Sequence, residues 1–147
     1  MEILKLIDNI CSFLNIFVQS RTIFALEIAK GGDKLQQAAE SGKPQCSRTV
    51  GAGLQAEATC KSVTMHDLGQ ALQVLAELYV DRDIVDLTGL PGTYDLKLSW
   101  VGRQTIDQVG GLTLPAALEK QLGLKLERRN LPVPVIVIDH LEKATLN

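Results

Sequence analysis

The chain has 147 residues, of which 46% are hydrophobic and 22% charged, and its formal net charge at pH 7 is −2. This length and composition suit a single soluble domain over residues 1–147 with a core of its own. The sequence has no basic stripe and no block of like charges, which argues against nucleic acid and anionic membrane as partners. No stretch approaches the roughly 20 apolar residues of a membrane-spanning helix.

Residues 1–30 predict an N-terminal helix followed by a β-hairpin. Apolar residues at positions 3, 4, 6, 7 and 10 lie on one face of a short helix. Residues 13–19 and 22–29 are rich in β-branched and aromatic side chains and are separated only by Ser20 and Arg21, which predicts two strands joined by a tight turn. The start of the chain lacks the features of a signal peptide, so we expect it to begin within a folded unit.

Residues 31–53 are expected to be the least regular part of the chain, a loop with weak helical potential at residues 35–40. Glycine and proline recur through it and interrupt any periodic pattern. Cys46 falls in this loop, and a disulfide to Cys60 would close about 15 residues and stabilise the fold by about 3 kcal/mol in an oxidising compartment. Cys11 would then remain unpaired. Because the cysteine count is odd and the chain shows no export signal, three reduced cysteines fit the sequence equally well.

Residues 54–147 predict a core of two helix-strand-strand units in tandem. The stretch 54–63 alternates small or apolar residues with polar ones, as a half-buried strand does. Thr64 suits a helix N-cap with Asp67 in the capping-box position, and the helix is expected to run to Tyr79. Its apolar stripe consists of Met65, Leu68, Leu72, Leu75 and Ala76, widened by Val74 and Leu78.

The second unit repeats this order. Thr113 and Pro115 predict the start of a helix over residues 112–122, which Gly123 ends. Each helix is followed by a short strand, a turn and a longer strand, at 84–87 and 94–100 in the first unit and at 124–127 and 133–139 in the second. We therefore predict an α+β fold in which an antiparallel-rich sheet carries both helices on one face.

Several stretches resemble one family in the same order along the chain: residues 24–32, 63–65, 85–95, 118–127 and 137–143. The family is a group of uncharacterised exported proteins that is associated with soil and abundant in acidobacterial genomes. The resemblance runs from about Phe13 to the C-terminus and implies an exported or periplasmic location, although this chain shows no signal peptide. It implies no activity, because the family has none established. More weakly, the tandem units are similar to the short N-terminal domains of secretins and TonB-dependent receptors, which are protein-interaction modules.

One candidate metal site lies in the loop after the first core helix. The sequence has no nucleotide-binding or serine-hydrolase motif, and two histidines are too few for a dinuclear zinc site. Asp81, Asp83 and Asp86 offer hard oxygen donors at short spacing, which suits calcium. The alternative is a solvated loop between a helix and a strand.

One candidate catalytic group lies near the C-terminus. Asp139 and His140, together with Asp95, would form a carboxylate-oriented imidazole that acts as a general base. The alternative is a surface histidine beside an aspartate, since no nucleophile is identifiable by spacing.

The function that these observations favour is a non-catalytic binding or protein-interaction module. Pro132 and Pro134 beside the apolar run 133–138 indicate a strand at the border of its sheet, so we expect a homodimer or a protein partner through this edge. The alternative is a small calcium-dependent hydrolase of an ester or lactone, such as an acyl lactone. In that case the cation polarises the carbonyl, and a carboxylate or His140 activates water.

Overall fold

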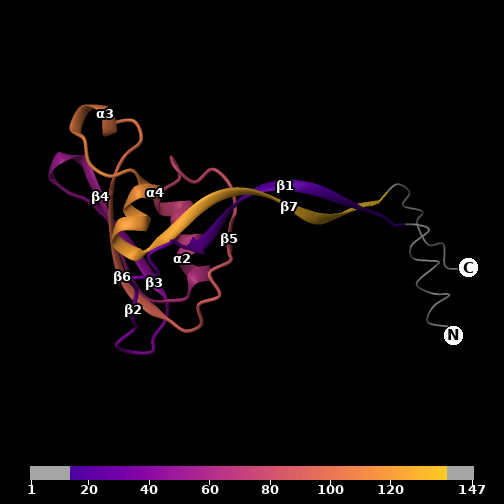
Figure 1. Cartoon of the computed structure of the whole chain (residues 1–147), viewed down its shortest axis with the longest axis horizontal. Coiled ribbons are helices and arrows are strands. Elements are labelled where there is room, and N and C mark those ends of the chain that lie inside the picture. Colours follow the sequence, from indigo (N-terminus) through magenta and orange to yellow (C-terminus); the bar gives the residue numbers. More distant parts are fainter. Residues whose placement is uncertain (1–13, 139–147) are drawn as a thin grey trace, which may run out of the picture. The chain divides into compact units, whose positions relative to one another are not determined.

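The computed structural model describes the backbone of residues 14–138 and the side chains of residues 19–132. The chain has an α+β fold, as predicted, but its strands form two sheets, one of three and one of four strands (Figure 1). Residues 23–129 form one compact unit, and residues 14–22 and 130–138 belong to a second. The expectation of one domain over the whole chain stays a prediction, and the helix expected in residues 1–10 lies outside the described residues.

The four-stranded sheet is antiparallel throughout, with the strand order β2-β6-β4-β3. Its members are β2 (Gln36–Gln37), β3 (Gln45–Val50), β4 (Gln55–Val63) and β6 (Tyr94–Val101). The short 3-10 turn η1 (Ala52–Leu54) joins β3 to β4. Along β4 the predicted alternation is confirmed, with buried Ala56, Ala58 and Cys60 between exposed or half-exposed polar residues. One face of this sheet therefore carries the core, and the other is polar.

Two helical segments pack on the buried face, which confirms both predicted helices. The first, α2 (Met65–Leu75), packs against β4. The second, α4 (Leu114–Ala117), continues into the π-helix η2 (Leu118–Leu122), and both pack against β6 (Figure 1). The leucines of these helices share one core with Leu98 and Trp100 of β6. A third short helix, α3 (Ile106–Val109), was not predicted.

Local sequence signals set the ends of these helices. The predicted capping box is present, because the Asp67 N–H donates to Thr64 Oγ1 and the Thr64 N–H donates to the Asp67 carboxylate, each at 3.1 Å. Thr113 Oγ1 accepts from the N–H of Ala116 at 3.3 Å. Gly123 ends η2 with φ +66°, and a Cβ at this position would collide with the backbone of residues 32 and 33. Glycine is therefore required there.

The first helix is shorter than predicted, and its apolar stripe is narrower. It ends at Leu75, four residues before Tyr79. Val74 and Leu78 are 75% and 54% exposed, so they do not widen the stripe. Val74 follows Leu72 by two residues, which places it on roughly the opposite side of the helix from the sheet.

The three-stranded sheet has the order β5-β1-β7 and consists of β1 (Leu14–Ile28), β5 (Ile84–Asp86) and β7 (Leu124–Ile138). The predicted hairpin in residues 13–29 is wrong, because β1 is one continuous strand. Ser20 and Arg21 provide neither the glycine nor the asparagine that a two-residue hairpin turn favours. The predicted turn between 127 and 133 is also wrong. Asn130 lies within β7, and its Oδ1 accepts from the hydroxyl of Thr22 in β1 at 2.8 Å.

The predicted tandem helix-strand-strand units are not formed, because β5 and β6 belong to different sheets. Residues 87–93 connect the two sheets rather than closing a hairpin. β5 pairs in parallel with β1, where Phe24 is the partner of Ile84. Such a long-range pairing leaves no mark in the local pattern on which the prediction rested.

Residues 31–53 are more regular than predicted. β2 lies within the stretch 35–40, where weak helical potential was expected, so that expectation is wrong. β3 pairs with β4 over six consecutive residue pairs, and a disulfide joins the directly opposed Cys46 and Cys60. Within residues 14–138 no helix is long and apolar enough to span a bilayer.

Candidate functional site

β3 is an outer strand of the four-stranded sheet, and no strand of the described chain pairs with its second edge. Its residues are exposed apart from Cys46, which is half-buried. An unpaired edge offers backbone donors and acceptors to which the strand of another chain can bind. Which groups β3 offers follows from its pairing with β4.

The disulfide partners Cys46 and Cys60 have Cα atoms 4.1 Å apart. A short separation of about 4.5 Å is typical of a non-hydrogen-bonded antiparallel pair, against about 5.5 Å for a hydrogen-bonded pair. The N–H and C=O groups of Cys46 therefore point away from β4. Because the pattern alternates along the strand, those of Arg48 and Val50 do so as well. β3 thus presents the backbone groups of these three residues along its open edge.

The outer edge of β6 confirms this alternation independently. The Ser99 N–H donates to Gln121 Oε1 at 2.9 Å, and Gln121 Nε2 donates to the Ser99 C=O at 2.8 Å. Both backbone groups of Ser99 therefore point away from β4, and its opposite residue Glu57 must bond toward β3 instead. Cys60 lies three residues after Glu57 on β4, so its backbone groups must point to the other side, toward β6. The short Cα separation of Cys46 and Cys60 requires the same direction.

The two edges of this sheet differ in how far the chain covers them. Along β6 and at Thr93 just before it, all the other outward-facing positions except Lys97 are bonded within the chain: Thr93 to Ala38, Asp95 to Gln36, and Val101 to Leu112 and to the Tyr79 hydroxyl. Burial raises the pKa of Tyr79, which keeps this hydroxyl protonated as a donor. No described residue covers the outward groups of β3 in this way. The edge of β3 is therefore the candidate binding site.

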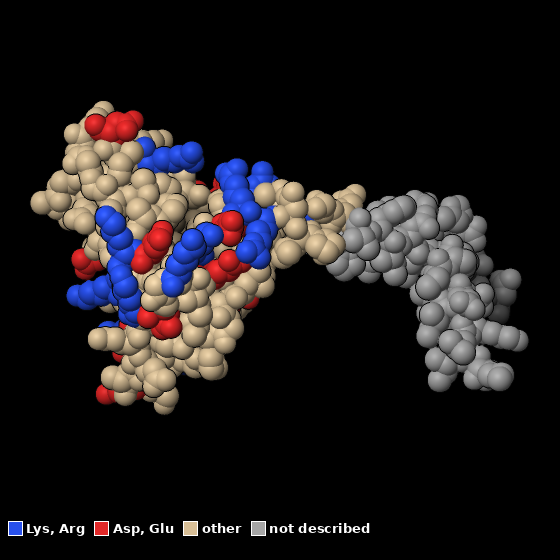
Figure 2. Space-filling view, in the orientation of Figure 1, with Lys and Arg blue, Asp and Glu red and all other residues tan. Residues whose placement is uncertain are grey.

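The side chains of β3 give this edge positions of different charge and polarity. Arg48 is exposed and lies between the disulfide and Val50, which is 59% exposed. A hollow of about 550 Å³ beside the first half of the strand is lined by residues 44–47 with Thr59 and Lys61. Figure 2 shows acidic and basic side chains interspersed over the visible face. The charge at a surface position is therefore set by individual side chains rather than by a large patch of one sign.

Asp95, predicted as part of a catalytic group, holds two stretches of backbone. Its Oδ1 accepts from the N–H of Ser62 at 2.9 Å, and its Oδ2 accepts from the N–H of Ala39 at 3.2 Å. These hydrogen bonds lower the pKa of Asp95 below its ordinary value. Ser62 has φ +55° at the irregularity in β4 between Cys60 and Val63, so the carboxylate fixes a strained residue. Asp139 and His140 lie outside the described residues, and their role stays a prediction.

Two of the three aspartates of the predicted calcium site have separate hydrogen-bonding roles. Asp86 Oδ1 accepts from the backbone N–H of Thr88 at 2.9 Å and from its hydroxyl at 2.6 Å. Asp83 accepts from Gln73 Nε2 at 3.3 Å, which ties the loop to α2. Asp81 is exposed on the loop. Among the residues that the structure describes, no group of three or more His, Cys, Asp or Glu side chains is placed to hold a metal ion.

The β3 edge was not predicted from the sequence, although one signal pointed to it. Cys46 and Cys60 are 14 residues apart, and Gly53 lies midway between them. A cysteine pair centred on a glycine-containing turn is the arrangement of two opposed residues in a hairpin. The polar character of residues 45–50 obscured this, because an outer strand with both faces exposed shows no apolar alternation.

Comparisons with known proteins place the chain in a family. A search of curated proteins and a search of solved structures each returned no match. The similarity to domains of secretins and TonB-dependent receptors therefore carries no further argument. The model of a family described as protein of unknown function (DUF3738) matches residues 18–141, which agrees with the resemblance to an uncharacterised family. Since this match spans most of the two sheets and the helices between them, the chain belongs to the DUF3738 family.

Proposed function

We propose that this chain is a non-catalytic protein-interaction domain that binds an extended segment of another protein as an additional strand beside β3. The observation that carries the proposal is the contrast between the two edges of the four-stranded sheet. β6 is covered by β2, Gln121 and Leu112 at every outward position except Lys97, whereas the outward groups of Cys46, Arg48 and Val50 have no partner among the described residues. Strand addition would satisfy these groups with main-chain hydrogen bonds.

The disulfide supports this proposal because it orders the edge before binding. Cys46 is one of the three outward-facing residues and is fixed covalently to the buried Cys60. A binding edge that is already ordered loses less conformational entropy on association. A disulfide also favours an oxidising compartment, which is consistent with the proposed exported or periplasmic location.

The charge of Arg48 favours a different protein over a second copy of this chain. In an antiparallel pairing of two copies that uses all the outward groups of β3, Arg48 lies opposite Arg48 of the second copy. Like charges directly opposite each other destabilise a strand pair. A segment with Asp or Glu opposite Arg48 and an apolar residue opposite Val50 would instead match both side chains. The proposed partner is therefore an acidic extended segment.

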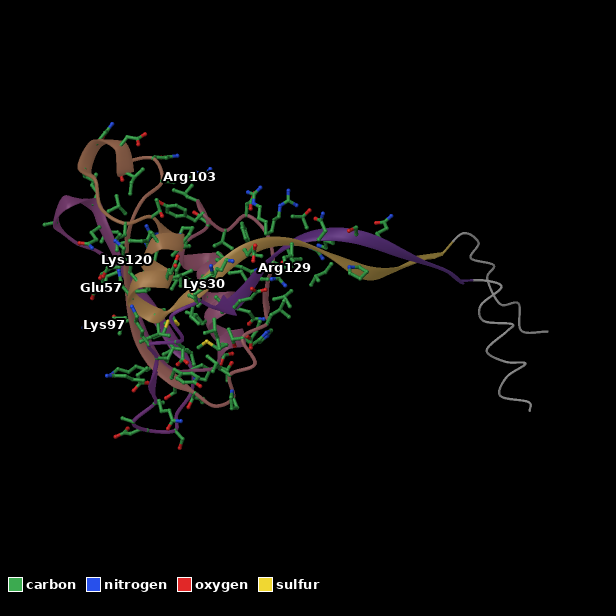
Figure 3. All side chains as sticks on the ribbon, in the orientation of Figure 1. Lys30, Glu57, Lys97, Arg103, Lys120 and Arg129 are labelled. Atoms are coloured by element: carbon green, nitrogen blue, oxygen red, sulfur yellow. A yellow bond between two sulfur atoms is a disulfide. The ribbon has the colours of Figure 1, made fainter. Side chains whose placement is uncertain are left out.

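Designed peptides test this proposal. A capped peptide Val-Thr-Glu-Thr-Val is expected to bind about tenfold more tightly than Val-Thr-Lys-Thr-Val, since the central residue changes from an opposite to a like charge. Binding is measured by NMR titration of the ¹⁵N-labelled chain, with the amides of Cys46, Arg48 and Val50 as reporters. Arg48→Glu is expected to reverse the preference. Arg103→Glu, at an exposed arginine after β6, makes the same charge change and is expected to leave it unaltered (Figure 3).

Arg48→Pro separates strand addition from simple charge attraction. It removes an N–H that points outward and is not used in pairing with β4, so it is expected to abolish binding while the fold is retained. Peptide binding that survives Arg48→Pro would overturn the proposal. Dimerisation through β3, seen by analytical ultracentrifugation and lost in this variant, would overturn the choice of partner.

The ester or lactone hydrolase remains the alternative. Two of its residues, Asp139 and His140, lie outside the described part of the chain, and no observation on the described residues favours it.

A further inference from the structure

A second candidate site lies at the covered edge of the sheet, on β6. A pocket of about 430 Å³ opens there between β2 and Gln121 of η2, within the range of about 300–1,000 Å³ for small-molecule sites. Leu96 and Leu122 contribute apolar surface. Lys34, Lys61 and Lys97 contribute charge. The lining thus combines apolar surface with polar and charged side chains, the two kinds of group that a ligand site offers.

Backbone groups in this pocket lack a partner at one position. Outward-facing residues of β6 alternate, and those at 93, 95, 99 and 101 are bonded to other parts of the chain. Lys97 is the remaining outward position in this series, and none of the described residues bonds to its N–H or C=O. Its neighbours along the edge, Gln36 and Gln121, both line the pocket. The pocket therefore contains one open backbone donor and one open backbone acceptor side by side.

The adjacent Ser99 shows which chemical group fits such a pair. There the carboxamide of Gln121 accepts from the N–H at 2.9 Å and donates to the C=O at 2.8 Å. An amide group of a ligand can make the same two bonds at Lys97. A carboxylate alone cannot, since it has no hydrogen to donate to the C=O.

The charges around the pocket favour an anionic group beside this amide. Three lysines and one carboxylate, Asp95, line it, so their formal charges sum to +2 (3 − 1 = 2). Both oxygens of Asp95 already accept from backbone N–H groups, and Lys34 Nζ donates to the Lys120 C=O at 3.0 Å. Lys61 and Lys97 are exposed on the polar face of the sheet (Figure 3 labels Lys97). Their ammonium groups are the ones placed to bind a carboxylate.

We infer that this pocket binds an N-acylated amino acid, in which an amide and a carboxylate are adjacent. The amide would bond to the open N–H and C=O of Lys97, and the carboxylate would bond to the lysine side chains. The same chemistry occurs in a free acyl amino acid and in the C-terminal residue of a peptide. Thr59 and Lys61 also line the hollow beside β3. The two sites still use different backbone groups, because Lys97 lies on β6 and the outward groups of Cys46, Arg48 and Val50 lie on the opposite edge of the sheet.

NMR titration of the ¹⁵N-labelled chain tests the inference. N-acetylalanine is expected to produce saturable shifts at the Lys97 amide and the Gln121 side-chain NH₂, with no change at Arg48 or Val50. N-acetylalanine amide, which lacks the carboxylate, is expected to bind at least about tenfold more weakly, as is acetate, which lacks the amide. An acetylated tripeptide with a free C-terminal alanine that binds more tightly than N-acetylalanine would identify a peptide as the source, and the reverse order would identify a free acyl amino acid.

Lysine variants test the anionic half of the ligand. Lys61→Ala combined with Lys97→Ala keeps the backbone groups and is expected to weaken N-acetylalanine binding about tenfold or more. Lys30→Ala, at an exposed lysine that does not line the pocket, is the matched control and is expected to have no effect. The inference is overturned if N-acetylalanine gives no saturable shift, if its amide or acetate binds equally well, or if the double variant binds as tightly as the unaltered chain.

Discussion

Gln121 is expected to protect the edge of β6 through its side chain, and Gln121→Ala tests this directly. The carboxamide makes two hydrogen bonds to the backbone of Ser99, at 2.9 and 2.8 Å, across 22 residues of sequence. It thereby takes the place of a neighbouring strand at this residue. Truncation leaves the Ser99 N–H and C=O without a partner from the chain, at the margin of a pocket into which water can enter.

The expected loss of stability follows from these two bonds. A neutral hydrogen bond contributes about 1 kcal/mol net, so losing both lowers the free energy of unfolding by about 2 kcal/mol. In a domain of about 150 residues this corresponds to a fall in Tm of about 4–8 °C. Gln108→Ala, at an exposed glutamine of α3 for which no side-chain bond is found, is the control and is expected to change stability by no more than about 0.5 kcal/mol.

Urea denaturation measures the stability of both variants, and amide hydrogen exchange reports on Ser99 itself. In Gln121→Ala the Ser99 amide is expected to exchange faster, while amides that bond between β4 and β6 keep their protection. Gln121→Glu keeps an acceptor for the Ser99 N–H and should preserve part of its protection. Unchanged exchange at Ser99 in Gln121→Ala would show that the side chain does not cover this edge, and the register assigned to β6 would then lose its main support.

Three further predictions concern the rest of this sheet. Ser47→Pro removes a hydrogen bond to β4, whereas Arg48→Pro removes an outward-facing N–H. Ser47→Pro is therefore expected to lower the free energy of unfolding, measured by urea denaturation, by at least about 2 kcal/mol more than Arg48→Pro. Equal losses would contradict the register of β3. Replacing Cys46 and Cys60 together by alanine is expected to lower the free energy of unfolding by about 3 kcal/mol relative to the oxidised chain, and no difference would indicate that the bridge does not form. The pKa of Asp95 is lowered by hydrogen bonds from Ser62 and Ala39, so the stability it contributes is present above its ordinary pKa and is lost as the pH falls through the lower folded value. In Asp95→Asn the free energy of unfolding is therefore expected to fall less steeply below about pH 4 than in the unaltered chain. An equally steep fall in both would show that this carboxylate contributes nothing to the pH dependence of stability.

Features that depend on neighbouring residues could be predicted from the sequence. The capping box of Thr64 and Asp67 and the cap at Thr113 are examples, because their physical causes lie within one helical turn. The alternation along β4 was also predictable, since one of its faces is buried in the core. The boundaries of these elements were predicted to within two residues, apart from the end of α2, which lies four residues before the predicted one.

Features that depend on distant partners could not be predicted in the same way. Propensity alone does not distinguish one long strand from a hairpin, and β1 is continuous because β5 and β7 pair with it from far along the chain. The candidate site at β3 was missed for a related reason. Its residues are polar and exposed, and only their pairing with β4 shows that they form a strand with an open edge. Asp95 was predicted as part of a catalytic group, and that role stays a prediction. Its hydrogen bonds to Ser62 and Ala39 could not be predicted, because they are tertiary contacts.

The pairing of β1 with β7 determines the order in which the two sheets can fold. The disulfide that joins β3 and β4 closes over 14 residues, whereas the bond from Thr22 to Asn130 spans 108. The entropy of closing so long a loop makes the three-stranded sheet the slower to form. Until β7 is available, Ile23, Phe24 and Leu26, all of which the folded chain buries, have no strand beside them on that side. A chain that leaves the ribosome N-terminus first must therefore keep β1, with its apolar residues, incompletely paired until β7 has been made.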